Sequence, residues 1–305
     1  MTPSAPGTTG PAERAAWQRL AAFAVGLLVL LTAGYGVGLL AGPFATPAGH
    51  PAGEMAGHGS DELAGHGADP ASDVGGLQVE QGGYRLVPQT TGLTVGTATP
   101  LAFRIVDGHG AALTRYTATH TRDLHLIVVR RDLTGFQHLH PELGADGTWR
   151  TTVTVAEAGQ YRLVAQFQPA GRDATLALGV DLPAAGGYQP QPLPEPVGTV
   201  RTDDGYQVTL DHAPGTGVGS TVTVRISRGG APVTDLEPYL GAGGHLVAFR
   251  AADLAYLHVH PHPFDTAHGP QLSFDLVLPG AGSYRLFLEF AHRGTVHTAA
   301  FTVTV

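Results

Sequence analysis

The sequence contains no cysteine, and only 2 of its 305 residues are methionine. The absence of cysteine excludes disulfide bonds, thiolate metal sites and thiol-based catalysis. Charged residues are also scarce at 14%, and the 17 Lys and Arg residues are mostly spread singly along the chain. A surface that binds phosphates needs clustered basic side chains, so nucleic acid is not expected as a partner.

Glycine, proline and histidine are abundant instead, with 43, 23 and 16 residues. Many glycines and prolines, together with frequent Val, Thr and Leu, are typical of short strands joined by turns rather than of long helices. The composition therefore predicts an all-β protein. The histidine count, with so few other soft ligands, directs attention to metal binding.

One long apolar run, LAAFAVGLLVLLTAGYGVGLLAG at residues 20–42, has no charged residue and is long enough to cross a bilayer as a helix. Arg14 and Arg19 precede it and acidic residues follow it, so residues 1–19 are expected in the cytoplasm and the bulk of the chain outside it. This predicts a single-pass protein of the cell membrane. A cleaved signal peptide is the alternative, but its apolar region usually spans only about 7 to 15 residues.

Residues 43–77 lack hydrophobic periodicity and predict a flexible stalk rich in His, Gly and Ala. An eight-residue unit repeats in it, as EMAGHGSD and then ELAGHGAD, which places His58 and His66 in matching contexts with His50 nearby. Such a tract either captures metal loosely or serves only as a solvated spacer.

The rest of the chain is an internal repeat. HLIVVRRDLTGFQHLHP aligns without a gap with HLVAFRAADLAYLHVHP, and AGQYRLVAQF aligns with AGSYRLFLEF. Each unit holds seven or so predicted strands in about 105 residues, the size of one Ig-like β-sandwich. We therefore expect sandwich domains at residues 78–183 and 199–305, joined by a Pro/Gly linker at 184–198.

The histidines of the first copy fall on two neighbouring predicted strands. His125 begins one strand, and His138 and His140 lie near the end of the next. A hairpin turn centred between Asp132 and Leu133 would place His125 opposite His140, with His138 two residues along on the same face. Three imidazoles at these positions could converge on one metal ion.

The second copy repeats this arrangement with His245, His258 and His260, so the sequence predicts one site in each domain. The histidine face also carries large apolar residues, which predicts that it is a core face: Ile127, Val129 and Phe136 in the first copy, and Val247, Phe249 and Tyr256 in the second. The alternative interpretation is that the histidines are core or rim residues hydrogen-bonded to the backbone.

Two further histidines could join the sites. His120 precedes the first strand but aligns with Leu240, and His262 extends the second motif as HVHPHP. The predicted metal ligands are therefore His120, His125, His138, His140, His245, His258, His260 and His262. The histidines outside these motifs and the stalk are expected in surface or loop positions: His109, His212, His268, His292 and His297.

Imidazole ligands without thiolate suit Cu(II), Zn(II) or Ni(II), and Cu(II) leads this series in affinity. Copper is therefore the expected cofactor, with zinc and nickel as alternatives. A blue-copper centre is excluded because it needs a cysteine ligand. No general base or nucleophile stands at motif spacing, so no catalytic residue is predicted and the protein is not expected to be an enzyme.

The two motif blocks, HLIVVRRDLTGFQHLHPE and PVTDLEPYLGAGGHLVAFRAADLAYLHVHP, resemble the exported YtkA-like family, which is related in fold to the FixH-like proteins. The resemblance covers roughly residues 80 to 305. It implies Ig-like sandwiches outside the cytoplasmic membrane and suggests a connection with copper. Matched residue by residue, it carries over two sets of histidines: His120, His125, His138 and His140, and then His245, His258 and His260.

These features predict a membrane-anchored, extracytoplasmic tandem β-sandwich that binds a transition metal for sequestration, sensing or hand-off. Its expected partners are the metal ion, the membrane through the N-terminal helix, and other envelope proteins. One alternative is an adhesive or assembly module whose histidines are structural. Another is a zinc-dependent hydrolase, which requires an acidic residue about one water away from the imidazoles.

Overall fold

A computed structural model describes residues 25, 28, 74–211, 214–216, 219–257, 259–264 and 271–305. Apart from residues 25 and 28, the predicted cytoplasmic segment, the membrane span at 20–42 and the stalk up to residue 73 lie outside the described residues. Within the described ranges, no helix has the length and apolar character that a membrane span requires.

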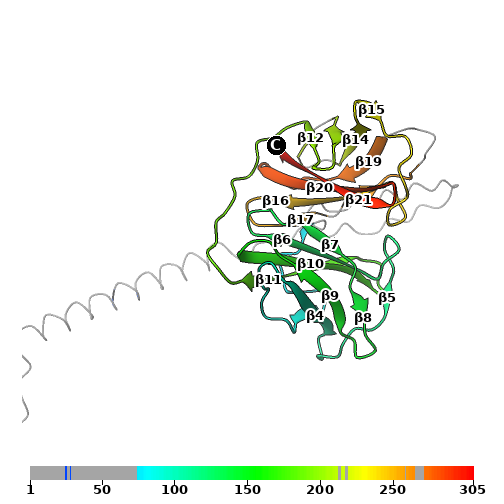
Figure 1. Cartoon of the computed structure of the whole chain (residues 1–305). Coiled ribbons are helices and arrows are strands. Elements are labelled where there is room, and N and C mark those ends of the chain that lie inside the picture. Colours follow the sequence, from blue (N-terminus) through cyan, green and yellow to red (C-terminus); the bar gives the residue numbers. More distant parts are fainter. Residues whose placement is uncertain are drawn as a thin grey trace, which may run out of the picture. The chain divides into compact units, whose positions relative to one another are not determined.

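The first sequence repeat folds as two facing antiparallel sheets (Figure 1). One sheet has the order β2 (Glu80–Gln81), β3 (Tyr84–Pro88), β4 (Ala98–Asp107), β9 (Trp149–Thr154), β8 (Glu142–Leu143). The other has the order β11 (Leu176–Ala184), β10 (Gly159–Pro169), β6 (Leu124–Arg130), β7 (Gln137–Leu139), with β5 (Tyr116–Thr117) beside β10. Apolar side chains from the inner faces of both sheets, including Phe103 and Leu126, form one core.

The second repeat folds in the same way. One sheet has the order β12 (Thr199–Arg201), β13 (Tyr206–Leu210), β14 (Ser220–Arg228), β19 (Gln271–Leu276), β18 (His260–Pro261), with β15 (Ala231–Pro232) beside β14. The facing sheet has the order β1 (Val74–Gly75), β17 (Tyr256–Leu257), β16 (His245–Arg250), β20 (Ser283–His292), β21 (Thr295–Thr304). The described residues from Val74 onward therefore form two tandem β-sandwiches, which confirms the all-β prediction for this part of the chain.

The histidine face is not a core face of either sandwich, contrary to the prediction. Its apolar residues from both copies form a third buried cluster, in which Ile127 and Val129 lie with Val247 and Phe249. Consequently β6 is buried at all of its positions, because one face packs into its own sandwich and the other face packs against the second sandwich.

Equivalent residues of the two copies lie in this interface, each in contact with the other copy. Phe136 stacks on Phe287 with ring centroids 4.2 Å apart. Tyr256, which aligns with Phe136, donates a hydrogen bond from its hydroxyl to Gln166 Oε1 at 2.5 Å. The two copies thus present the same face to each other, as subunits do in a two-fold dimer.

The end of the predicted stalk also belongs to this junction. Val74 and Gly75 form β1 and pair with β17 of the second sandwich, although they precede the first sandwich in sequence. Gly76 N then donates to the carbonyl of Ala177 in the first sandwich at 2.8 Å. Gly179 is required here, since a Cβ on it would lie 1.8 Å from the carbonyl oxygen of Gly76. The predicted flexible stalk therefore ends before residue 74.

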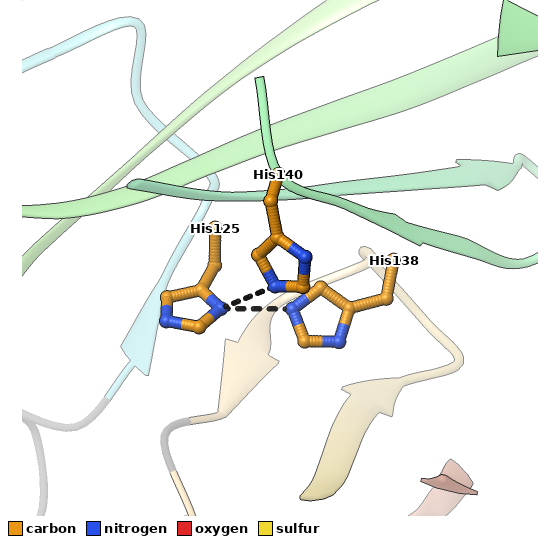
Figure 2. Close-up of side chains that lie close together, drawn as sticks. All are labelled: His125, His138 and His140. Atoms are coloured by element: carbon orange, nitrogen blue, oxygen red, sulfur yellow. Dashed lines mark hydrogen bonds between the residues drawn. The ribbon is translucent and has the colours of Figure 1, made fainter. Parts of the chain in front are cut away.

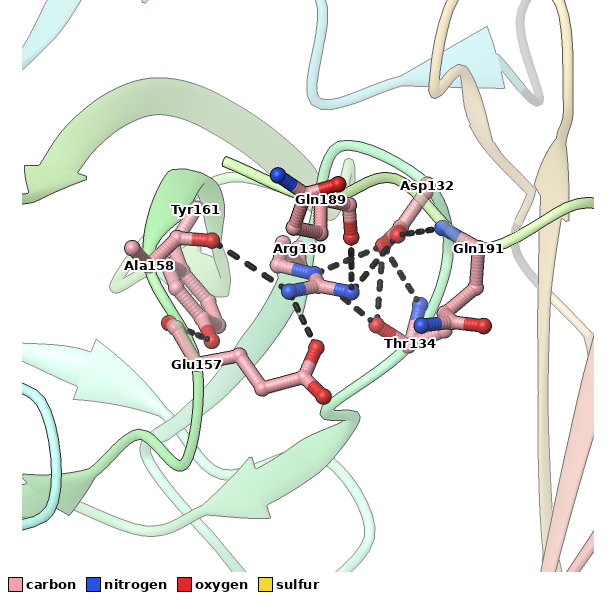
Figure 3. Close-up of polar contacts among 8 residues, drawn as sticks. All are labelled: Arg130, Asp132, Thr134, Glu157, Ala158, Tyr161, Gln189 and Gln191. Atoms are coloured by element: carbon pink, nitrogen blue, oxygen red, sulfur yellow. Dashed lines mark hydrogen bonds and ion pairs between the residues drawn. The ribbon is translucent and has the colours of Figure 1, made fainter. Parts of the chain in front are cut away.

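The hairpin between β6 and β7 is fixed by Arg130, which is 1% exposed (Figure 3). Its Nε and Nη2 donate to the two carboxylate oxygens of Asp132 at 2.9 and 2.7 Å, and its Nη1 forms an ion pair with Glu157. Gln191 N donates to Asp132 Oδ2 at 2.7 Å, which fastens the linker between the sandwiches to the same hairpin. The linker is thus held at this point rather than free along its whole length.

Replacing Arg130 with methionine is expected to lower the free energy of unfolding by about 3 kcal/mol, because Asp132 would then be a buried charge without its partner. The neighbouring Arg131 is exposed, so Arg131→Met is the matched control and should change stability by less than about 0.5 kcal/mol. Urea denaturation of both variants measures the difference. Equal stabilities of the two variants would contradict this role of Arg130.

Candidate metal centre

The predicted strand register brings the histidines of the first copy together. β6 and β7 pair as Leu126 with Leu139 and Ile127 with His138, so His140 follows β7 at the level of His125. This is the register expected from a turn centred between Asp132 and Leu133. A shift of one residue would have turned one strand's histidines to the opposite face.

The side chains of His125, His138 and His140, here called the triad, converge in Figure 2. Each offers one ring nitrogen, and these nitrogens all lie within 4.8 Å of one another. His125 Nδ1 lies 2.9 Å from His138 Nε2 and 3.3 Å from His140 Nε2. Two imidazole nitrogens bound to one tetrahedral ion at the usual 2.0–2.1 Å would stand roughly 3.3 Å apart, so the spacing of the triad fits a metal.

The outer nitrogens of two triad rings have fixed partners. His125 Nε2 donates to the carbonyl of Thr119 at 2.9 Å, which leaves Nδ1 with a lone pair directed at the other rings. His138 Nδ1 lies 2.6 Å from Glu289 Oε2, which comes from the second sandwich. Partners of this kind fix the tautomer and the orientation of metal-binding histidines in many proteins.

Burial keeps these imidazoles in the neutral form that binds metals. Loss of solvation is the main cause, and the neighbouring rings add to it, so that the pKa of His125 falls to about 4 and that of His140 to about 3. Burial also lowers the pKa of His138 and raises that of the Glu289 carboxyl. The His138–Glu289 contact therefore holds one proton near neutral pH, whichever partner carries it.

Glu289 also contacts the triad, although it is not among the predicted site residues. It aligns with Gln166 of the first copy, and it faces His245 across the β16–β20 pair. The alignment of AGQYRLVAQF with AGSYRLFLEF already contained this exchange of Gln for Glu. The hydrolase hypothesis required a carboxylate near the imidazoles, and Glu289 meets that condition, although its carboxylate is engaged by the outer nitrogen of His138.

The second predicted set of ligands is not assembled in the same way. The β16–β17 pair has the predicted register, with Ala248 opposite Leu257, but β17 ends at Leu257. β18 then begins at His260 and pairs with β19 in the other sheet, whereas β8 of the first copy begins only at Glu142, the equivalent of His262. The earlier change of sheet places His260 in a different sheet from β16. Burial lowers the pKa of the His120 imidazole, and His260 still lies close enough to add to this shift.

The remaining predicted ligands of the second copy have separate positions. His260 is exposed. His262 Nε2 lies 2.8 Å from Asp275 Oδ1 at the surface, and His258 lies outside the described residues. His245 instead lies beside the triad of the first copy, with its ring centroid 5.5 Å from that of His125.

His120 also lies at this place, with its ring centroid 4.6 Å from that of His245 and 5.9 Å from that of His125. It occupies a tight turn at a φ of 48°, and the second copy repeats the turn with Leu240 at 52°. His140 also lines a pocket that is open to the surface. Its lining residues include Arg122, Asp123, Glu142 and Trp149.

Two histidines that were expected at the surface are buried, so this prediction was wrong. His292 is 3% exposed and bonds through Nδ1 to the Tyr206 hydroxyl at 2.6 Å. His297 is 8% exposed and contacts the Asp204 carboxylate. Both ring nitrogens of each have partners, so these two residues fit a structural role in the second sandwich.

Comparison with known proteins gives a family. No curated protein matches the chain. Among solved structures, the Escherichia coli adhesin FdeC is 18% identical, with 73% of this chain and 64% of the adhesin covered and a TM-score of 0.24. A marsupial T cell receptor is 12% identical, with 71% and 94% covered and a TM-score of 0.22.

The tandem Ig repeats of Dlar are 11% identical, with 73% and 97% covered and a TM-score of 0.20. At these TM-scores, none of the three structures supports a conclusion about the fold or the function of this chain. The resemblance to the YtkA-like family stays a prediction. A family model matches residues 78–183 and 199–305, and the chain therefore belongs to the family defined by the domain of unknown function DUF8832, which it contains in two tandem copies.

Proposed function

We propose that this protein binds one transition-metal ion at the triad, with copper as the leading candidate. The bound metal serves sequestration, sensing or hand-off outside the cytoplasmic membrane. The observation that supports this most directly is the convergence of three ring nitrogens within 4.8 Å, two of them on rings whose outer nitrogens are already engaged. Buried neutral imidazoles prefer Cu(II) to Zn(II) or Ni(II). We propose further that residues 20–42 anchor the chain in the membrane.

We propose no catalysis. The Glu289 carboxylate contacts the outer nitrogen of His138, where it would orient a metal ligand rather than activate a water. Zinc-dependent hydrolysis therefore ranks below binding, even though three imidazoles and an open position suit catalytic zinc as well.

The alternative is an adhesive or assembly module with structural histidines. The observation that favours it is that buried histidines of the second sandwich, His292 and His297, are fully hydrogen-bonded without any metal. If the triad is only a polar part of the interface, metal ions will not stabilise the fold.

A melting experiment distinguishes the two functions. The sample is the full chain with His50, His58 and His66 replaced by alanine, which removes metal capture by the stalk. We expect Cu(II) at about 100 times its dissociation constant to stabilise the fold by about 2.7 kcal/mol, and to raise Tm by several degrees. An unchanged Tm across a Cu(II), Zn(II) and Ni(II) series would exclude the metal function and support the structural one.

A further inference from the structure

We propose that His245 supplies a fourth ligand from the second sandwich, so that the bound ion joins the two sandwiches to each other. This inference rests on the proposed metal site. It adds that metal binding regulates the interface between the two repeats. It also assigns a role to the duplication: one copy holds three ligands, and the other contributes one ligand and Glu289.

The first supporting observation is a missing hydrogen bond. His245 is 7% exposed, and its Nε2 is buried without a hydrogen-bond partner among the described residues. A buried polar atom that has lost its contact with water costs about 1 to 3 kcal/mol unless something binds it. Its Nε2 is therefore available to a ligand, whereas the outer nitrogens of His125 and His138 are engaged.

The second observation is ring spacing. The ring of His245 lies 5.5 Å from that of His125 and 5.4 Å from that of His138, and those two rings are 5.2 Å apart. Imidazole rings on one tetrahedral ion have centroids roughly 5 Å apart, given metal–nitrogen bonds of 2.0–2.1 Å. His245 thus stands at nearly the distance of a fourth ligand.

His245 is nevertheless outside the set of nitrogens that lie within 4.8 Å of one another, which contains only the triad among the described residues. Ligation therefore requires its ring to move toward the triad. Because β16 also carries Val247 and Phe249 of the interdomain cluster, such a movement would tighten the contact between the sandwiches. A free-energy coupling between metal binding and domain contact follows, and it acts equally in both directions.

The test compares His245→Ala with His297→Gln, which alters a buried histidine of the same sandwich away from the triad. Both variants carry the three stalk replacements in the full chain, and Cu(II) alone is the probe. We expect His245→Ala to weaken Cu(II) binding roughly 100-fold while retaining one ion, because three imidazoles remain. His297→Gln should leave the affinity unchanged.

Electron paramagnetic resonance and hydrogen exchange give independent readouts. In the parent chain we expect four coordinated nitrogens, and slower amide exchange in β6 and β16 when Cu(II) is bound. In His245→Ala we expect three nitrogens and no added protection of β16. If alanine prevents folding, His245→Gln retains most of the side-chain volume and serves instead.

The outcomes separate the two proposals. If the parent chain binds Cu(II) and His245→Ala binds it with the same affinity and spectrum, the fourth ligand is disproved and the triad site stands. If the parent chain binds no Cu(II), Zn(II) or Ni(II), the metal site itself is disproved. The proposed metal bridge between the two sandwiches is then disproved as well.

Discussion

His138→Ala is expected to weaken Cu(II) binding by roughly 1,000-fold, the largest effect of any single replacement. Structural zinc sites of four ligands bind with about 10–16 kcal/mol, so one ligand accounts for roughly 2.5–4 kcal/mol, or two to three powers of ten. The loss for His138→Ala is expected near the upper end of this range. The replacement also leaves Glu289, which is 6% exposed, without the imidazole that bonds it.

Competition titration with a chromophoric Cu(II) chelator measures this loss of affinity. The sample is the full chain with the three stalk histidines replaced by alanine. His109→Ala is the control, because His109 is exposed and lies in a turn of the first sandwich. Glu289→Gln should fall between the two variants, with a loss of about 10- to 100-fold, because it weakens the partner that orients His138 but keeps every ligand. An affinity for His138→Ala equal to that of His109→Ala would refute the role of the triad.

The stability of the metal-free protein is expected to be highest near pH 6.5 and to fall on both sides. Unfolded histidine has a pKa near 6.5, whereas burial lowers the folded pKa of His125 to about 4 and that of His140 to about 3. Between these values the unfolded chain binds protons that the folded chain excludes. The free energy of unfolding therefore decreases as the pH falls from 6.5 to 4, by up to about 3 kcal/mol for each of these two histidines.

Glu289 acts in the opposite direction. Burial raises its folded pKa from 4.5 to about 8, so the folded chain holds a proton there that the unfolded chain has released. Its contribution is present at low pH and is lost as the pH rises through 8. Below pH 6.5 the several histidines outweigh this one carboxyl, and above pH 6.5 it acts alone.

Urea denaturation from pH 4 to pH 9 in the presence of a chelator tests this profile. Glu289→Gln should abolish the decrease in the free energy of unfolding above pH 6.5. The decrease below pH 6.5 should remain. A metal-free stability that increases steadily from pH 6.5 to pH 8 in the parent chain would show that Glu289 is ionised in the folded state and contradict this account.

Much of the fold follows from local sequence patterns. The runs at 124–130, 206–210 and 245–250 coincide with β6, β13 and β16 as the structure has them. The position of each turn predicted the register of its hairpin. Residues that face each other in an antiparallel pair have a constant sum of residue numbers, and the centre of the turn fixes that sum.

The contact between the copies was not predicted, although the sequence contains its signal. LHLIVVR places apolar residues on both faces, with Leu126 on one and Ile127 on the other, and such continuous runs are typical of strands covered on both sides. A sandwich core covers only one face of a strand. The second face therefore needed a partner, and the duplicated sandwich supplied it.

The second histidine set shows what an internal repeat cannot predict. His245 and His260 align with His125 and His140, yet the pairing of β18 with β19 places them in different sheets. Which sheet a strand end joins depends on contacts distant in sequence, and the alignment of the motifs contains no information about them. The same limit applies to His292 and His297, whose acidic partners, Asp235 and Asp204, lie far away along the chain.

Native mass spectrometry of the stalk-replaced full chain with Cu(II) tests the central claim most directly. The triad is the one assembled set of ligands among the described residues, so the account predicts one retained ion per chain. His138→Ala should retain none at the same Cu(II) concentration. Two retained ions would indicate an independent site in each sandwich, and the absence of any retained ion would contradict metal binding altogether.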